Sequence, residues 1–416
     1  MALKTVVIVG TGWAGLTLAR KLDEKKFKIV IISPESTSPY TPLLASAACG
    51  LFDFSVAEEP VRRKSQNLRY IKAIVDNIDF VRKICFCSPA FEAISEQKFE
   101  VSYDCVVIAP GCTSQTFGTP GVQEHALFVK NVRDAMAVRQ RMSDLLEMAS
   151  LPNKTEQERK DMLHIIVVGG GPTGIEISAE LYDLIHNDFS ILYPHLANSM
   201  SIAVHDVASR ILSAFDASLS EYALASLSRR EVSIKTGSHI TKVEKDCLYT
   251  KEDGRIPYGM LIWATGNKQV PLVDTLPVLK SDRLPRILTD SRLRIFAPDA
   301  LSLIGSAYAL GDAADVRGGE LPTTAEVACQ KAEYLARVLN SEFLVPEPFA
   351  YSQRALVTYI GHHDGVIGGR KDWSGPRAWI AWRSKNLLWT RSWKTRILIG
   401  VNWVLNWAFG KEVARN

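Results

Sequence analysis

The sequence predicts an α/β protein with two Rossmann-like dinucleotide-binding domains and an amphipathic helical region at the carboxyl end. Three observations predict this fold: a glycine-rich turn between a strand and a helix at the start of the chain, a second such turn in mid-chain, and a matching strand-end turn after each. With 416 residues, the chain is long enough for two or three domains with sizeable cores.

The first glycine turn follows an apolar strand at residues 5–9 and opens a helix, and a strand at residues 27–32 completes a βαβ unit. Glycines at this spacing let the helix N-terminus face the pyrophosphate of a dinucleotide. Glu35 stands where an acidic residue would bind a ribose hydroxyl. The residues expected to bind a dinucleotide here are Gly10, Gly12, Trp13, Ala14, Gly15, Ser33 and Glu35.

The second glycine turn follows the β-branched run at residues 165–168, which is typical of a buried parallel strand. Its glycines are Gly169, Gly171 and Gly174. The next strand, at residues 200–204, leads to Asp206. A carboxylate there accepts hydrogen bonds from the adenosine ribose and repels a 2′-phosphate, so it favours NAD over NADP.

A sharp turn after a buried strand follows each glycine motif, at the sheet edge where open α/β sheets bind their ligands. The predicted contacts in these turns are Ala109 and Gly111 in the first half, Thr265 and Gly266 in the second, and Gly311 and Asp312 after a further strand. The Asp312 carboxylate can bind the ribityl hydroxyls of a flavin. Leu43 lies in a small-residue loop that suits close approach to a flat ligand. This duplication predicts two separate dinucleotides, one for each half.

Apolar periodicity predicts helices at residues 134–148, 175–185 and 323–339, and a polar loop at residues 153–160. The positive end of the helix at residues 323–339 is expected to face the pyrimidine edge of a flavin, where negative charge develops on reduction.

The tail from residue 370 onward has ten Lys and Arg residues against two acidic ones, and seven of the nine Trp. Trp379, Trp382 and Trp389 recur on one helical face, and a second apolar stripe consists of Ile397, Val401, Val404, Leu405 and Ala408. Trp with Lys and Arg on amphipathic helices is typical of a membrane interface. A dimer interface and a packed helix pair are the alternatives, and a homodimer is one possible assembly.

Composition excludes several other classes. The net charge of +4 is too small to indicate nucleic acid. The seven Cys contain no C-x-x-C, so we expect no metal site and a reducing compartment. No stretch reaches ~18 apolar residues, and neither a signal peptide nor a mitochondrial presequence is evident. We therefore expect peripheral membrane association on a reducing, cytoplasmic side.

The order of these motifs resembles the type II (alternative) NADH:quinone oxidoreductases, especially their fungal members. The resemblance covers nearly the whole chain and rests on residues 9–15, 31–34, 40–44, 168–176, 261–267 and 309–312, with two amphipathic helices at the end. It implies a flavoprotein fold like that of glutathione reductase. The implied domains are an FAD-binding domain at 1–113 and 300–345, an NADH-binding domain at 114–299, and a membrane-association region at 346–416.

The resemblance also implies the chemistry: NADH reduces FAD, which passes two electrons to a quinone. Gly10, Gly12, Gly15 and Asp312 would bind FAD, and Gly169, Gly171, Gly174 and Asp206 would bind NADH. Glu176 matches the glutamate that the family places near the nicotinamide.

Two residues depart from the family's pattern in the run after Asp312. Glu326 replaces a Gln that lines the family's quinone site, and Cys329 replaces a His of fungal members. A carboxylate would repel a quinone carbonyl unless it is protonated. The candidate catalytic residues are therefore Glu176, Glu326 and Cys329. The identity of the substrate that exchanges electrons with the flavin has two interpretations.

Besides a quinone, the substrate could be an apolar metabolite, such as a phenol, hydroquinone or terpenoid-like compound. His362 and His363 would then add acid–base groups near the flavin. A redox-sensing flavoprotein with incidental turnover is the third interpretation.

Overall fold

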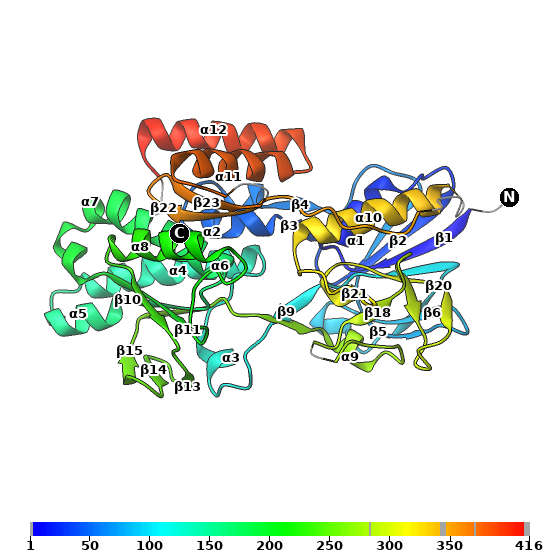
Figure 1. The fold of residues 1–416 in the computed structure, drawn as a ribbon, viewed down its shortest axis with the longest axis horizontal. Helices are drawn as coiled ribbons and strands as arrows, with labels where there is room; N and C mark the ends of the chain where they lie inside the picture. Colours follow the sequence, from blue (N-terminus) through cyan, green and yellow to red (C-terminus); the bar gives the residue numbers. More distant parts are fainter. Residues whose placement is uncertain (1–2, 283, 342–346, 370–371, 412–416) are drawn as a thin grey trace. The chain divides into compact units, whose positions relative to one another are not determined.

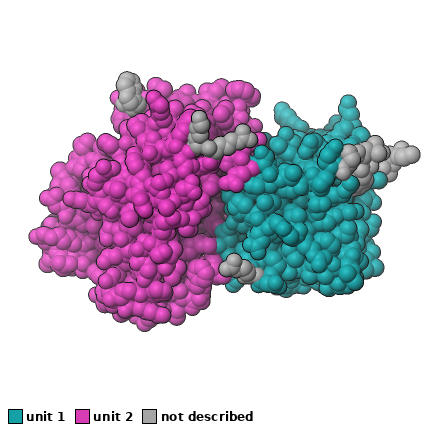
Figure 2. All heavy atoms as spheres, in the orientation of Figure 1, with its two compact units in different colours: residues 1–39, 59–113, 267–352 teal, residues 40–58, 114–266, 353–416 magenta. Residues whose placement is uncertain are grey.

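The computed structural model describes residues 3–282, 284–341, 347–369 and 372–411. The chain forms two compact units, which Figure 2 shows in different colours. Unit 1 comprises residues 1–39, 59–113 and 267–352, and unit 2 comprises residues 40–58, 114–266 and 353–416.

This division differs from the predicted domains in three places. Residues 267–299 belong to unit 1, whereas residues 40–58 and the tail belong to unit 2. The predicted boundary between residues 345 and 346 lies outside the described residues.

Unit 1 is built on a ten-stranded sheet in the order β21-β18-β19-β20-β8-β1-β2-β5-β6-β7. Its strands are β1 (Lys4–Val9), β2 (Phe27–Ser33), β5 (Leu68–Asp79), β6 (Ile84–Pro89), β7 (Phe99–Ser102), β8 (Cys105–Ile108), β18 (Ile287–Thr289), β19 (Arg294–Phe296), β20 (Leu303–Ala309) and β21 (Ala314–Val316). The centre of the sheet is parallel, because β1 pairs with β2 and β8, and β8 pairs with β20. Two short pairs lie outside it: β3 (Thr37–Pro39) with β4 (Glu58–Pro60), and β9 (Cys112–Ser114) with β17 (Asn267–Gln269).

Both faces of β1 are buried. Val6 and Ile8 enter one core, and Val7 and Val9 enter the other, which is why this strand is a continuous apolar run. The first face is covered by α1 (Trp13–Lys21) and α10 (Ala325–Asn340), which lie side by side in Figure 1. The opposite core includes residues of β6 and of α9 (Pro271–Thr275).

Unit 2 contains a four-stranded parallel sheet in the order β12-β11-β10-β16. Its strands are β10 (His164–Val168), β11 (Ser201–Asp206), β12 (Ser233–Thr236) and β16 (Met260–Trp263), and a small antiparallel sheet adds β13 (Ile240–Val243), β14 (Cys247–Thr250) and β15 (Gly254–Pro257). The helices are α2 (Leu44–Ala48), α3 (Val122–His125), α4 (Val132–Ala149), α5 (Glu156–Met162), α6 (Pro172–Leu184), α7 (Ser190–Leu192) and α8 (Ala217–Ser228).

The predicted helices at 134–148, 175–185 and 323–339 correspond to α4, α6 and α10. The prediction of a polar loop at residues 153–160 is wrong, because α5 begins there. Thr155 and Glu158 form a capping box in which each side chain accepts the backbone N–H of the other, and this arrangement stabilises a helix start.

The tail forms a hairpin of β22 (Leu356–Gly361) and β23 (Asp364–Gly368), the short strand β24 (Trp373–Ser374), and two helices, α11 (Pro376–Trp389) and α12 (Trp393–Phe409). No helix among the described residues is long and apolar enough to cross a membrane.

The sequence favours a lipid-facing surface for the Trp residues of α11, but Trp382 and Trp379 pack against the protein instead. Trp382 is 6% exposed and packs with Ala179 and Tyr359, and Trp379 packs against the same cluster. Helical periodicity identifies an apolar face but does not say what covers it, and here the face packs on unit 2 itself. The α12 stripe, in contrast, is exposed at Ile397, Val401, Val404 and Leu405.

Candidate active site

The glycine turn after β1 forms a cradle at the carboxyl edge of the unit 1 sheet. Gly10 has a φ of +103°, and a Cβ at this position would overlap the carbonyl oxygen of Ala109. A Cβ on Gly15 would overlap the carbonyl oxygen of Gly10, so this glycine lets α1 pack close to the turn. Gly12 has no heavy atom within 4 Å of an added Cβ, so the space above it is open. No described side chain caps the start of α1, which leaves its first N–H groups available for phosphate oxygens.

The loop after β2 is held against this cradle by Thr11. The hydroxyl groups of Thr11 and Ser33 are 3.0 Å apart, and Thr11 Oγ1 also donates to the carbonyl oxygen of Glu35 at 3.3 Å. Glu35 therefore lies at the carboxyl end of β2, next to the turn. Trp13 and Ala14 form the start of α1, so the predicted residues of this motif are brought together in unit 1.

Asp312 lies at the same edge, after β20. The Cys112 thiol donates to Asp312 Oδ2 at 3.2 Å, and Gln269 Nε2 donates to the Asp312 carbonyl oxygen at 3.1 Å. Gly311 has a φ of +67°, and its added Cβ would lie 3.4 Å from the Cβ of Ala14. Ala109 and Gly111 follow the neighbouring strand β8. Leu43 alone among the predicted flavin contacts belongs to unit 2.

The second cradle in unit 2 repeats the first. Gly169 has a φ of +116°, and its added Cβ would lie 2.6 Å from the carbonyl oxygen of Ala264. An added Cβ on Gly174 would overlap the carbonyl oxygen of Gly169, whereas one on Gly171 meets nothing within 4 Å. No described side chain caps the start of α6. The three glycines therefore have the same roles as in the first cradle. Gly169 forms the tight turn, Gly174 lets the helix pack close to it, and Gly171 leaves space open.

Asp206 and the turn after β16 complete this edge. The Asp206 carboxylate accepts the backbone N–H of Gly170 and, at 2.7 Å, that of Ala208. Thr265 Oγ1 donates to the carbonyl oxygen of Gln115 at 2.6 Å, and the Gln115 N–H donates to Gly266 at 2.9 Å. Asp206, Thr265 and Gly266 thus lie around the glycine turn.

Glu176 lies one turn into α6 and is partly exposed. Its Oε1 accepts the indole N–H of Trp382 at 3.0 Å and the backbone N–H of Tyr359 at 3.4 Å. Burial raises the pKa of Glu176, and the pKa stands at about 8 even though these two hydrogen bonds lower it. Glu180, one turn later, is 2% exposed and accepts the Ser46 hydroxyl at 2.6 Å. Burial raises the pKa of Glu180 to about 7.

Sequence reasoning missed Glu180, Asp183, Tyr359 and the role of Trp382. Asp183 accepts the Tyr359 hydroxyl and the backbone N–H of His362. One signal was present: the three acids of α6 recur at a spacing that places them on one helical face, next to apolar neighbours. Their partners, at positions 359, 362 and 382, carry no local signal.

Glu326 and Cys329 lie on α10 in unit 1, whereas Glu176 lies in unit 2. Glu326 is 8% exposed, and Gln330 Nε2 donates to its Oε1 at 3.2 Å. The Cys329 Sγ and the Thr17 hydroxyl lie 3.5 Å apart. His362 and His363 occupy the exposed turn between β22 and β23 in unit 2, both with positive φ.

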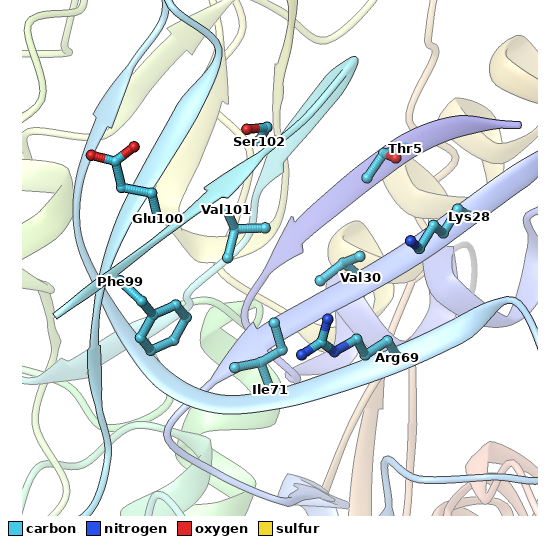
Figure 3. Close-up of a pocket in the computed structure, with 9 residues that line it drawn as sticks. All are labelled: Thr5, Lys28, Val30, Arg69, Ile71, Phe99, Glu100, Val101 and Ser102. Carbon is cyan, nitrogen blue, oxygen red and sulfur yellow. The ribbon is translucent and has the colours of Figure 1, made fainter. Parts of the chain in front are cut away.

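Unit 1 has a cavity of about 480 Å³, and Figure 3 shows the residues that line it. Lys28 and Arg69 line it from near the starts of β2 and β5, and Phe99 lines it from β7. Because cofactors bind at the carboxyl ends of parallel strands, this cavity is separate from the glycine cradle.

Comparisons with known proteins identify relatives of this chain. A family model described as pyridine nucleotide-disulphide oxidoreductase matches residues 4–332. A probable NADH dehydrogenase of Dictyostelium discoideum is 34% identical, in an alignment that covers 98% of this chain and 90% of that protein. External NADH-ubiquinone oxidoreductase 2 of Saccharomyces cerevisiae is 31% identical, over 98% of this chain and 82% of that protein.

This chain belongs to the type II NADH:quinone oxidoreductase family. The structure of NDH2 from Plasmodium falciparum in complex with NADH matches it with a TM-score of 0.91 over 100% of both chains. At 24% identity, that likeness shows the fold. As a member of the family, the chain is a flavoprotein oxidoreductase whose cofactors are FAD and NADH.

Proposed function

We propose that this protein oxidises NADH through FAD and reduces a quinone, while bound to the surface of a membrane. The overall reaction converts NADH, a proton and a quinone to NAD⁺ and a quinol. The observation that carries this proposal is the duplicated cradle, with matching glycine roles at the carboxyl edges of two parallel sheets. The relatives named as NADH-ubiquinone oxidoreductases support the quinone as acceptor.

We assign FAD to unit 1 and NADH to unit 2. The donors at the start of α1 suit a pyrophosphate, and Asp312 suits the ribityl hydroxyls. In unit 2, the start of α6 suits the second pyrophosphate, and Asp206 suits the adenosine ribose. When bound, FAD supplies the two-electron chemistry, and the protein supplies binding, orientation and electrostatics. Glu176 would act at the nicotinamide side of unit 2, where it holds or releases a proton.

Membrane association is supported by the apolar face of α12. Its exposed residues are Trp393, Ile397, Val401, Val404, Leu405 and Phe409, each at least 47% exposed. A helix with this face suits the interface between lipid headgroups and acyl chains. The basic residues of the tail would favour anionic lipids. We place the protein on a membrane face exposed to a reducing compartment.

The flavin spectrum of the purified protein tests the proposal. We expect a flavin spectrum that anaerobic NADH bleaches and that a short-chain quinone then restores. A protein that takes up no flavin, or a bound flavin that NADH does not reduce, would overturn it. A flavin that only an added organic substrate reduces would favour the apolar metabolite instead.

A further inference from the structure

Two hydrogen bonds join the tail of the chain to the candidate nicotinamide site. The indole N–H of Trp382 on α11 donates to Glu176 Oε1 at 3.0 Å, across 206 positions of sequence. The second donor to this oxygen is the backbone N–H of Tyr359, at 3.4 Å. Glu176 Oε2 receives no hydrogen bond from any residue that the structure describes. One carboxylate oxygen is thus fixed by the protein, and the other is left for a ligand or a proton.

The indole of Trp382 is itself held in place. It stacks on the Tyr359 ring, with the ring centroids 4.9 Å apart and an angle of 19° between the planes. The Tyr359 hydroxyl donates to Asp183, which also accepts the His362 N–H at 3.0 Å. Because Asp183 and Glu176 both belong to α6, the hairpin and α11 are tied to the helix that carries the site.

We propose that Trp382 is a positioning residue that fixes the carboxyl group of Glu176, so that α11 is part of the nucleotide site of unit 2. The proposal rests on the proposed role of Glu176 near the nicotinamide. A large aromatic ring with few rotatable bonds suits this task, because its N–H is held in one direction at little entropic cost. A hydrogen bond to an ionised carboxylate is also among the stronger kinds in proteins.

The charges around Glu176 set the sign of the expected effect. Glu180 on the same helix raises the pKa of Glu176, and Lys385 on α11 lowers the pKa of Glu176. On β22, the titratable group is the Tyr359 phenol, and burial and the charge of Glu180 raise the pKa of the Cys49 thiol, just after α2. The Trp382 hydrogen bond favours the ionised form, so its loss should raise the pKa of Glu176 further.

The test compares Trp382→Phe with Trp379→Phe in the FAD-loaded enzyme. Trp379 lies one turn earlier on α11 and packs against the same cluster, yet makes no hydrogen bond to Glu176 among the described contacts. For Trp382→Phe, we expect the midpoints of the pH profiles of NADH kcat/KM and of NAD⁺ binding to rise by about one pH unit. Trp379→Phe should leave both midpoints in place. Trp382→Tyr fills more of the space without the indole N–H and replaces the Phe variant if that protein does not fold.

The Glu176→Gln variant distinguishes the positioning role of Trp382 from the role of Glu176 near the nicotinamide, on which it rests. In the Glu176→Gln background, Trp382→Phe should cause no further shift, because the titrating group has been removed. Unshifted midpoints in Trp382→Phe, or an equal effect in the Gln background, would overturn the positioning role. If Glu176→Gln alone left NADH kinetics and NAD⁺ binding unchanged at every pH, the assumed role of Glu176 would fail instead.

Discussion

At the scale of single residues, the glycines of each cradle have different tasks. Gly174 lets α6 approach the turn, because a Cβ there would overlap the Gly169 carbonyl oxygen. Gly171 leaves space for a ligand, because a Cβ there meets no atom within 4 Å. Stability and nucleotide affinity should therefore respond to different substitutions.

Gly171→Ala should weaken NADH binding by at least about tenfold and lower the free energy of unfolding by less than about 1 kcal/mol. Gly174→Ala should lower the free energy of unfolding by about 1–3 kcal/mol, because its Cβ forces the helix and turn apart. NADH titration and denaturant unfolding measure the two effects. Gly305→Ala, in an open position of β20, is the control. Unchanged NADH affinity in Gly171→Ala would contradict the ligand-facing role.

Glu180 should make the stability of the protein depend on pH. Its pKa is raised by burial from the ordinary value of 4.5 to about 7. The native state therefore keeps a proton that the unfolded chain has released. The contribution of this residue is fully present below about pH 4.5 and is lost as the pH rises through about 7. The difference amounts to about 3 kcal/mol at most.

Glu180→Gln should remove most of this loss, because a neutral amide can still accept the Ser46 hydroxyl. The free energy of unfolding, measured from pH 5 to pH 8, should fall less steeply in the variant than in the native protein. Glu320→Gln changes an exposed acid and serves as the control. Parallel curves for native protein and Glu180→Gln would show that Glu180 is ionised in the folded state throughout this range.

Substitution of Glu326 tests whether a quinone is the electron acceptor. A carboxylate only accepts hydrogen bonds, whereas a glutamine amide can donate one to a quinone carbonyl. Glu326→Gln should therefore lower the KM for a short-chain quinone several-fold, with little change in the KM for NADH. Steady-state kinetics with both substrates checks this, and Glu320→Gln is again the control. A higher quinone KM would show that the native carboxyl group assists the acceptor.

Residue-level prediction from the sequence was strong where the chemistry is local. The glycine motifs, Asp206 and Asp312 sit at strand ends, which can be recognised from the apolar runs that precede them. The bond between Trp382 and Glu176 was not predictable, because it depends on how α11 packs onto the hairpin of β22 and β23. The same holds for Ser46 and Glu180, which are 134 positions apart.

At the scale of elements, α11 and α12 look alike in sequence but differ in their surroundings. On α11, the buried apolar face packs on unit 2. The guanidinium carbon of Arg383 lies 5.2 Å from the ring centroid of Trp379 and 4.1 Å from that of Trp403. On α12, Asn406 Nδ2 donates to the Leu51 carbonyl oxygen at 2.7 Å, and the apolar stripe remains exposed. Periodicity predicted both helices correctly, but burial had to come from the structure.

Substitution of Ile397, Val401 and Val404 by Asp should reduce binding to vesicles of anionic phospholipid by at least about tenfold. In the native protein, docking would bury each of these apolar side chains away from water, and full burial stabilises the bound state by about 1.5–3 kcal/mol per side chain. Co-sedimentation measures the binding. The control replaces Val81 and Leu301, which are 94% and 89% exposed in unit 1, by Asp. Equal vesicle binding by native protein and the α12 variant would exclude α12 as the docking face.

At the scale of the whole molecule, the two cradles lie in separate compact units, each with its own parallel sheet and core. The sequence predicted this duplication, because each half carries a complete set of strand-end signals. It did not predict that the tail belongs to unit 2, since that depends on packing between segments far apart in the sequence, such as Ser226 with Asp364, 138 positions apart, and Glu176 with Trp382, 206 positions apart. Nucleotide binding should therefore stabilise the units separately.

NADH should protect unit 2 even when flavin is absent. We expect Gly12→Ala, whose Cβ enters the open space of the first cradle, to lose FAD but keep its fold. In this variant, NADH at 100 times its dissociation constant should still stabilise the NADH-binding unit by about 2.7 kcal/mol. Hydrogen exchange should show protection at residues 169–174 and around Asp206. FAD added to the native protein should instead protect residues 10–15 and 311–312. Protection by NADH confined to residues 10–15 would reverse the assignment of the two nucleotides, because a ligand slows exchange chiefly in the unit that it stabilises.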